Sequence, residues 1–270
     1  MRAIAAIGAA APALWLAARA GLGDLGPRPL TEAIHFCGLW ALRLLALTLA
    51  VSPLAALMRW PRLIAVRRIL GDAVFAYAAL HIVLFTADKM FDLTVVAQEI
   101  VKRFYLSVGV IAFVLLVPLA ATSTDAAVRR LGPHMWRRLH KLVYIVAALA
   151  LVHFTLQVKL DISEPVAMAA IFFLLALLRA PRLRREPLTI SFTIFATIIA
   201  TFTAMLAEAG WFAAHGAPFF AALADNMDFS EGARPGWAPA VVGAVFVVLA
   251  LFARLTDRVH LSKLAAKTSR

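Results

Sequence analysis

The sequence predicts an all-α fold, a polytopic membrane bundle of about eight transmembrane helices. Two observations predict this class. Of the 270 residues, 63% are hydrophobic and 16% are charged, whereas a soluble domain is about half apolar and a quarter charged. The apolar residues are also gathered in runs close to the roughly 20 residues that a helix needs to cross a bilayer.

The eight expected spans lie near residues 3–20, 33–57, 71–88, 104–121, 140–158, 165–178, 188–207 and 238–254. The first contains Pro12, and the sixth is short for a complete crossing. The first span also resembles a signal peptide, because Arg2 precedes an apolar run that ends in Ala18-Arg19-Ala20, an A-x-A cleavage pattern. Removal of this segment is therefore an alternative to its retention, and it leaves the orientation of the other seven helices unchanged.

The lysines and arginines are divided unequally between the two sides of this arrangement. Segments on one side hold 19 of them, segments on the other hold 7, and Arg43 lies within a span. Because basic loops are retained on the cytoplasmic face, we expect a multi-pass membrane protein with both termini in the cytoplasm. The basic residues behind the net charge of +12 are then expected to bind lipid headgroups or a cytoplasmic anion, and no nucleic-acid partner is expected.

One candidate boundary interrupts the chain, the basic segment RAPRLRREP at residues 179–187. It separates a histidine-bearing core, residues 1–187, from residues 188–270, which we expect to be an accessory two-helix extension. The two helices of this extension are joined by a long outside loop at 208–237 that is rich in Trp, Phe and acidic residues. This loop is a second place where a partner could dock.

Several redox chemistries are excluded by the composition. The lone Cys37 excludes an internal disulfide, a CxxC pair and a cysteine-ligated iron–sulfur cluster. The sequence has neither GxGxxG after a strand nor GxxxxGK[ST], so the chain has no nucleotide-binding domain of its own. Any electrons must therefore come from another molecule and travel on another cofactor.

Two histidines lie deep within spans, His81 in the third and His153 in the fifth. Counted from the start of each span at 1.5 Å per residue, they lie about 15 and 20 Å deep. Two imidazoles at similar depth on different helices suit the axial positions of a b-type haem. The alternative is a pair of polar residues that satisfy each other or line a proton path.

A basic set lies at the cytoplasmic end of the same helices. Arg67 precedes His81 by 14 residues, so a continuous helix places it below His81 on nearly the same stripe. His140 precedes His153 by 13 residues and faces the same interior only if the first helical turn is distorted. Together, Arg67, Arg68 and His140 can receive a haem propionate or a flavin phosphate. For Arg43, a propionate contact and simple snorkelling stay open, and His134, His215 and His260 receive no role.

Four segments in a fixed order resemble a known family: RRILGDAVFAYAALH, VKRFYLSVG, PLAATST and GPHMWRRLHKLVYIVAALALVH. They are similar to the MsrQ (YedZ) family, within the ferric reductase-like transmembrane superfamily, over roughly residues 30–180. The family's haem-ligand positions fall on His81 and His153. His140 matches its third histidine, and Arg67 and Arg68 match its basic pair.

The resemblance implies a ferric reductase-like haem-binding domain at residues 1–187, with b haem between the third and fifth helices and FMN as a further cofactor. It implies a non-catalytic electron-transfer subunit of the bacterial inner membrane. Such a subunit takes electrons from quinol or a cytoplasmic flavin reductase and passes them to MsrP, a periplasmic molybdopterin enzyme that reduces methionine sulfoxide in oxidised proteins. The chain departs from the family pattern in extending past residue 187.

Two other functions stay open at this stage. One is a stand-alone, quinol-linked cytochrome b that reduces ferric iron or oxygen species at the outer face. The other is a transporter that uses His81 and His153 as a proton relay, which predicts a colourless protein.

Overall fold

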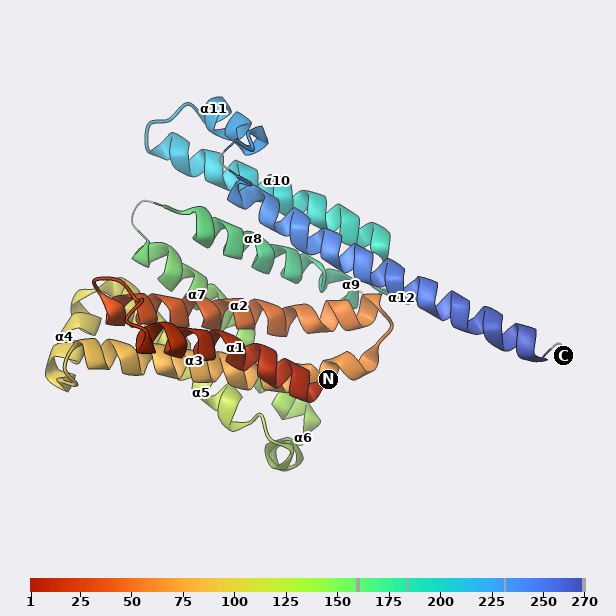
Figure 1. The fold of residues 1–270 in the computed structure, drawn as a ribbon, viewed down its shortest axis with the longest axis horizontal. Coiled ribbons are helices and arrows are strands. Elements are labelled where there is room, and N and C mark those ends of the chain that lie inside the picture. Colours follow the sequence, from red (N-terminus) through yellow and green to blue (C-terminus); the bar gives the residue numbers. More distant parts are fainter. Residues whose placement is uncertain (159–160, 184, 231, 269–270) are drawn as a thin grey trace. The chain divides into compact units, whose positions relative to one another are not determined.

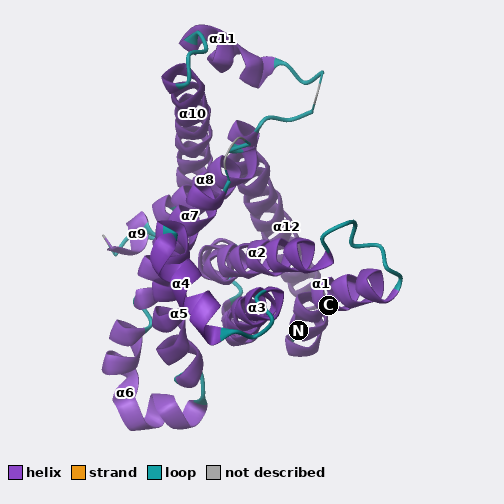
Figure 2. Cartoon of the chain, turned by 90° about the vertical axis from the view of Figure 1, so that its left-hand side faces the viewer, coloured by secondary structure: helices purple, strands orange, loops and turns teal. Residues whose placement is uncertain are grey.

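The computed structural model describes residues 1–158, 161–183, 185–230 and 232–268. In this part of the chain every regular element is a helix (Figure 2), which confirms the predicted fold class. Six of the described helices are long and apolar enough to cross a membrane, or seven if one bent pair is a single span. Lys159, Arg184 and Arg270, three of the counted basic residues, lie outside the described residues, as does the side chain of His260.

The chain folds as two compact units. The first unit comprises residues 1–48 and 65–160. Its helices are α1 (Arg2–Gly21), the first two thirds of α2 (Pro29–Leu57), α3 (Val66–Asp88), α4 (Leu93–Lys102), α5 (Phe104–Ala121), α6 (Asp125–Leu139) and α7 (Leu142–Gln157). Within it, α5 packs against α3, α4 and α7, while α1 lies along α3 (Figure 1).

The second unit comprises residues 49–64 and 161–270. Its elements are η1 (Pro61–Ala65), α8 (Ser163–Leu177), α9 (Ala180–Leu183), α10 (Ile190–Ala214), α11 (Phe219–Ala224), η2 (Asp225–Met227), η3 (Pro235–Trp237) and α12 (Ala238–Thr268). The helices α8, α10 and α12 pack against one another, and α11 lies at one end of α10 (Figure 1). By packing, α8 therefore belongs with α10 and α12, whereas the functional boundary expected at residue 187 stays a prediction.

All eight expected spans are helices, although some bounds differ. The helix α3 begins at Val66, five residues before the expected start, because Arg67 and Arg68 continue the helix instead of forming a loop. The short sixth span is α8, with 15 residues. The expected fifth span, 140–158, is α7, which joins the preceding helix α6 at a 44° bend beside His140.

Local capping explains where the connecting helices start. The Asp92 carboxylate accepts hydrogen bonds from the main-chain N–H groups of Thr94 and Val95, at 2.9 and 3.1 Å, and so begins α4. In the same way, the Thr124 hydroxyl accepts from the N–H of Ala127 at 3.1 Å and begins α6. Both helices are too polar or too short to span a bilayer, and their caps hold them between the spans.

The first helix is packed against α3. Its buried residues are Ala9, Pro12 and Leu16, and the Tyr77 hydroxyl donates a hydrogen bond of 2.9 Å to the main-chain carbonyl of Ala9. Pro12 lacks an N–H and so leaves this helix one internal hydrogen bond short. These contacts make α1 part of the first unit's packing and favour its retention over removal as a signal peptide.

We therefore expect the mature protein to keep its N-terminal helix. Intact-mass analysis of the membrane protein should give a mass that includes residues 1–20. The Tyr77→Phe variant should keep the same N-terminus and unfold more readily by about 1 kcal/mol, because one hydrogen bond is lost. A mature N-terminus near Gly21 in the unaltered protein would show that the segment is a signal peptide.

Candidate functional site

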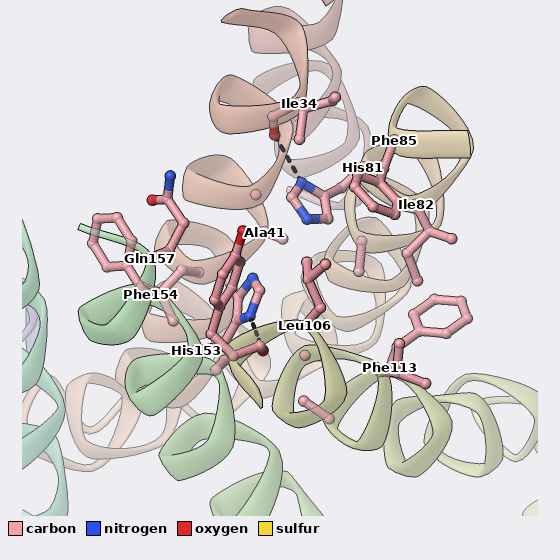
Figure 3. Close-up of a pocket in the computed structure, with 18 of the residues that line it drawn as sticks. Ile34, Ala41, His81, Ile82, Phe85, Leu106, Phe113, His153, Phe154 and Gln157 are labelled. Carbon is pink, nitrogen blue, oxygen red and sulfur yellow. Dashed lines mark hydrogen bonds between the residues drawn. The ribbon is translucent and has the colours of Figure 1, made fainter. Parts of the chain in front are cut away.

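His81 and His153 face each other across a cavity inside the first unit (Figure 3). The cavity has a volume of about 330 Å³ and lies among α2, α3, α5 and α7, with α4 at one end. The two imidazole centroids are 6.2 Å apart, and the ring planes are nearly perpendicular, at 86°. The structure thus brings together the two histidines that the sequence singled out.

Each imidazole is bonded to the main chain of a neighbouring helix. His81 Nδ1 lies 2.8 Å from the carbonyl oxygen of Ile34 on α2, and His153 Nδ1 lies 2.7 Å from that of Tyr105 on α5. Because a carbonyl only accepts, both Nδ1 atoms carry the proton. Both Nε2 atoms therefore keep a free lone pair, and in Figure 3 they point toward one another.

A glycine makes each of these bonds possible. A Cβ placed on Gly38 of α2 would lie 3.0 Å from His81 Nδ1, and one placed on Gly109 of α5 would lie 2.8 Å from His153 Nδ1. Each glycine is four residues beyond the carbonyl that accepts the bond, so it occupies the same helix face. The absence of a side chain lets the imidazole lie directly against the helix backbone.

The geometry fits one metal ion bound from both sides. Two imidazoles that hold a metal through nitrogens about 2 Å away place their centroids about 6 Å apart. No group of three or more His, Cys, Asp or Glu side chains among the described residues could hold a bare ion. The two histidines therefore suit a metal whose other ligands come from a macrocycle, as in haem.

The alternative in which the two histidines satisfy each other is not what the structure shows. Each Nδ1–H is bonded to a carbonyl of another helix, and no hydrogen bond joins the two rings. Their Nε2 atoms, which remain for a ligand, face an apolar cavity whose volume lies within the roughly 300–1,000 Å³ typical of cofactor sites.

The predicted basic set gathers where α3 begins and α6 ends. His140 stacks on Trp136, with centroids 3.9 Å apart, and its Nε2 lies 3.1 Å from the Thr122 hydroxyl. Arg67 is close enough to act electrostatically on His140. The 44° bend between α6 and α7 lies beside His140, which does not line the cavity between His81 and His153.

Arg68 has a different partner from Arg67. Its guanidinium donates to the Asp125 carboxylate at 2.6 Å and so ties α3 to the start of α6. This hydrogen bond, together with the nearby charge, holds the pKa of Asp125 below its ordinary value. Asp125 therefore stays ionised at neutral pH, and Arg68 is less available to an external anion than the prediction assumed.

Other singled-out residues lie away from the cavity. Arg43 lies over the Trp40 ring, at 5.4 Å from the centroid, and does not line the cavity. His134 is exposed on α6, and His215 bonds to the carbonyl of Trp211 at one end of α10. The segment 208–237, expected as an outside loop, begins with the last turns of α10 and is folded in its described part, where Trp237 donates to the Asn226 carbonyl at 2.8 Å.

The sequence reasoning missed two pairs of residues at this site. Gly38 and Gly109 could have been found as single glycines inside apolar helices, a pattern that often marks close approach of another group. His35 and Gln157 lie at one end of the cavity, where their Nε2 atoms are 3.0 Å apart. The only signal for them is their helical spacing, since Gln157 follows His153 by four residues and His35 precedes Gly38 by three.

Comparison with known proteins agrees with this site. The family model described as "Ferric reductase like transmembrane component" matches residues 37–151, a range that includes His81 and ends two residues before His153. No solved structure matches the chain.

The chain matches most of the length of several curated relatives. A "Protein-methionine-sulfoxide reductase heme-binding subunit MsrQ" from Caulobacter vibrioides is 42% identical over 176 residues, which is 65% of this chain and 84% of the relative. One from Rhodospirillum rubrum is 42% identical and covers 65% and 85% of the two chains. One from Xanthomonas campestris is 47% identical and covers 60% and 74%. At this identity and coverage, the chain belongs to the MsrQ family.

Proposed function

We propose that this protein is the haem-binding, electron-transferring membrane subunit of a protein-methionine-sulfoxide reductase system. The observation that carries the proposal is the pair of imidazoles, 6.2 Å apart, whose Nδ1 protons are bonded to helix carbonyls and whose Nε2 atoms point toward one another. The named relatives supply the system to which such a subunit belongs.

His81 and His153 would hold haem b between them. The bound haem supplies one-electron redox chemistry at a position inside the membrane. The chain's own part is to fix both imidazole tautomers and to exclude water with the apolar walls of the cavity. Nothing in the site is specific for a sulfoxide, so we assign the two-electron reduction of methionine sulfoxide to a separate periplasmic, molybdopterin-dependent partner.

We place the electron input at Arg67, Arg68 and His140. Basic side chains at this end can hold a flavin phosphate. FMN bound there would shorten the distance that an electron must cross to reach the haem. Arg67 precedes His81 by 14 residues of one helix, which is about 21 Å. We propose quinol or a cytoplasmic flavin reductase as the donor and, from the basic-residue count, an inner-membrane orientation with cytoplasmic termini.

The first prediction concerns the ligands. The His81→Ala and His153→Ala variants should each lose most of their haem, because one axial ligand is removed. Haem content by pyridine haemochromogen assay measures this. Full retention of haem in either variant would exclude that residue as an essential ligand, and a colourless unaltered protein would favour the transporter alternative.

Glycine variants test the same site without removing a ligand. In Gly109→Ala the new Cβ would lie 2.8 Å from His153 Nδ1, so the imidazole must move. Haem content should fall, or the low-spin electron paramagnetic resonance signal should change, and less so in Gly38→Ala. Gly71→Ala on α3 is the matched control, since nothing lies within 4 Å of its added Cβ.

The second prediction concerns electron input. An Arg67→Ala/Arg68→Ala double variant should keep its haem and show slower haem reduction by the cytoplasmic donor, because the positive site is removed. Stopped-flow absorbance measures the rate. An Arg129→Ala/Arg130→Ala variant, which removes the same charge from exposed positions on α6, should reduce at the original rate. Equal rates in all three proteins would contradict this assignment.

The third prediction tests the function as a whole. Under anaerobic conditions, the dithionite-reduced haem should reoxidise when the partner molybdoenzyme and a methionine sulfoxide are added together. Replacing the sulfoxide with methionine should leave the haem reduced. If the full mixture leaves the haem reduced while ferric citrate alone reoxidises it rapidly, the stand-alone ferric reductase function should replace this proposal.

A further inference from the structure

The cavity between the histidines has one polar end and one apolar end. Apart from His81 and His153, its polar lining residues share one location, the end where α2 and α5 begin and α3 and α7 finish. They are Thr31, His35, Asp88, Tyr105 and Gln157, which we call the polar mouth. The opposite end is lined by Leu45, Val74, Ala112, Leu116 and Val146, and no polar side chain among the described lining residues lies there.

This asymmetry matches the shape of a haem. One edge of the porphyrin carries two propionates, and its other edges carry methyl and vinyl groups. A carboxylate pressed into an apolar wall is strongly disfavoured, whereas at the mouth it can reach hydrogen-bond donors and water. We propose that the haem binds with its propionate edge at the polar mouth, where His35 and Gln157 receive it as positioning residues. This inference rests on the proposed ligation by His81 and His153.

His35 and Gln157 are placed to act together at this edge. They come from α2 and α7, and the Gln157 amide donates to His35 Nε2 at 3.0 Å. Thr31 lies one turn before His35 on the same helix face. Each of these side chains can offer a hydrogen-bond donor to a carboxylate.

The one acid at the mouth does not oppose this orientation. The Asp88 carboxylate is bound by the Lys89 ammonium at 2.9 Å, so its charge is already compensated. The basic set offers no competing place for the propionates. Arg67 does not line the cavity, and it lies about 21 Å along α3 from His81, farther than a propionate reaches from an iron between the two rings.

The test compares two forms of the cofactor on the full-length protein. Cofactor-free protein in lipid nanodiscs is titrated with iron protoporphyrin IX and with its dimethyl ester, which lacks the propionate charges. The unaltered protein should bind the free acid more tightly. The His35→Leu/Gln157→Leu variant should bind the free acid about tenfold more weakly and the ester as before, because only the bonds to the charged edge are lost.

Matched variants separate this effect from misfolding. A His215→Leu/Gln98→Leu variant makes the same changes at exposed positions and should behave like the unaltered protein. The single variant His35→Gln, which keeps a hydrogen-bond donor at this position, should retain most of the preference for the free acid. All of these proteins should show the same bis-imidazole absorbance spectrum.

Two results would overturn the orientation while leaving the histidine ligands in place. One is equal affinity of the unaltered protein for the acid and the ester. The other is loss of the preference in Arg67→Leu/Arg68→Leu but not in the His35/Gln157 variant, which would place the propionates at the opposite end. Full haem retention in both His81→Ala and His153→Ala would instead refute the proposed ligation, and this inference would fail with it.

Discussion

The hydrogen bond from each imidazole Nδ1 to a helix carbonyl is the interaction on which the site depends. A carbonyl inside a helix already accepts one bond from the N–H four residues later, and its second lone pair remains available. In both helices that later residue is a glycine, Gly38 after Ile34 and Gly109 after Tyr105. The histidine can therefore reach the carbonyl without breaking the helix, and both the tautomer and the direction of Nε2 are fixed.

The surrounding membrane protein makes this arrangement effective. In an apolar interior each buried polar group needs a hydrogen-bond partner, and each Nδ1–H donates to a main-chain carbonyl. The Nε2 lone pairs are left facing the cavity from α3 and α7. A metal bound between them satisfies both atoms at once, so the same constraint that orients the ligands also favours the loaded state over the empty one.

Much of the fold and half of the site could be predicted from the sequence. Apolar length predicts the spans, and a polar side chain inside a span makes His81 and His153 conspicuous. The pattern could not show that Arg67 and Arg68 continue α3, because arginines suit either a helix end or a loop. It also could not show Arg68 bound to Asp125, 57 residues away, or His35 bound to Gln157, since such pairs depend on how helices pack.

The two ends of the first unit carry different side chains and therefore suit different ligands. At the end holding Arg67 and His140, positive charge favours a phosphate or another anion, and apolar side chains close the cavity before that end is reached. At the mouth, His35 and Gln157 offer neutral donors that can hold a carboxylate without a strong field. The first unit therefore carries its positive charge at one end and neutral hydrogen-bond donors at the other, and aliphatic side chains line the cavity between them.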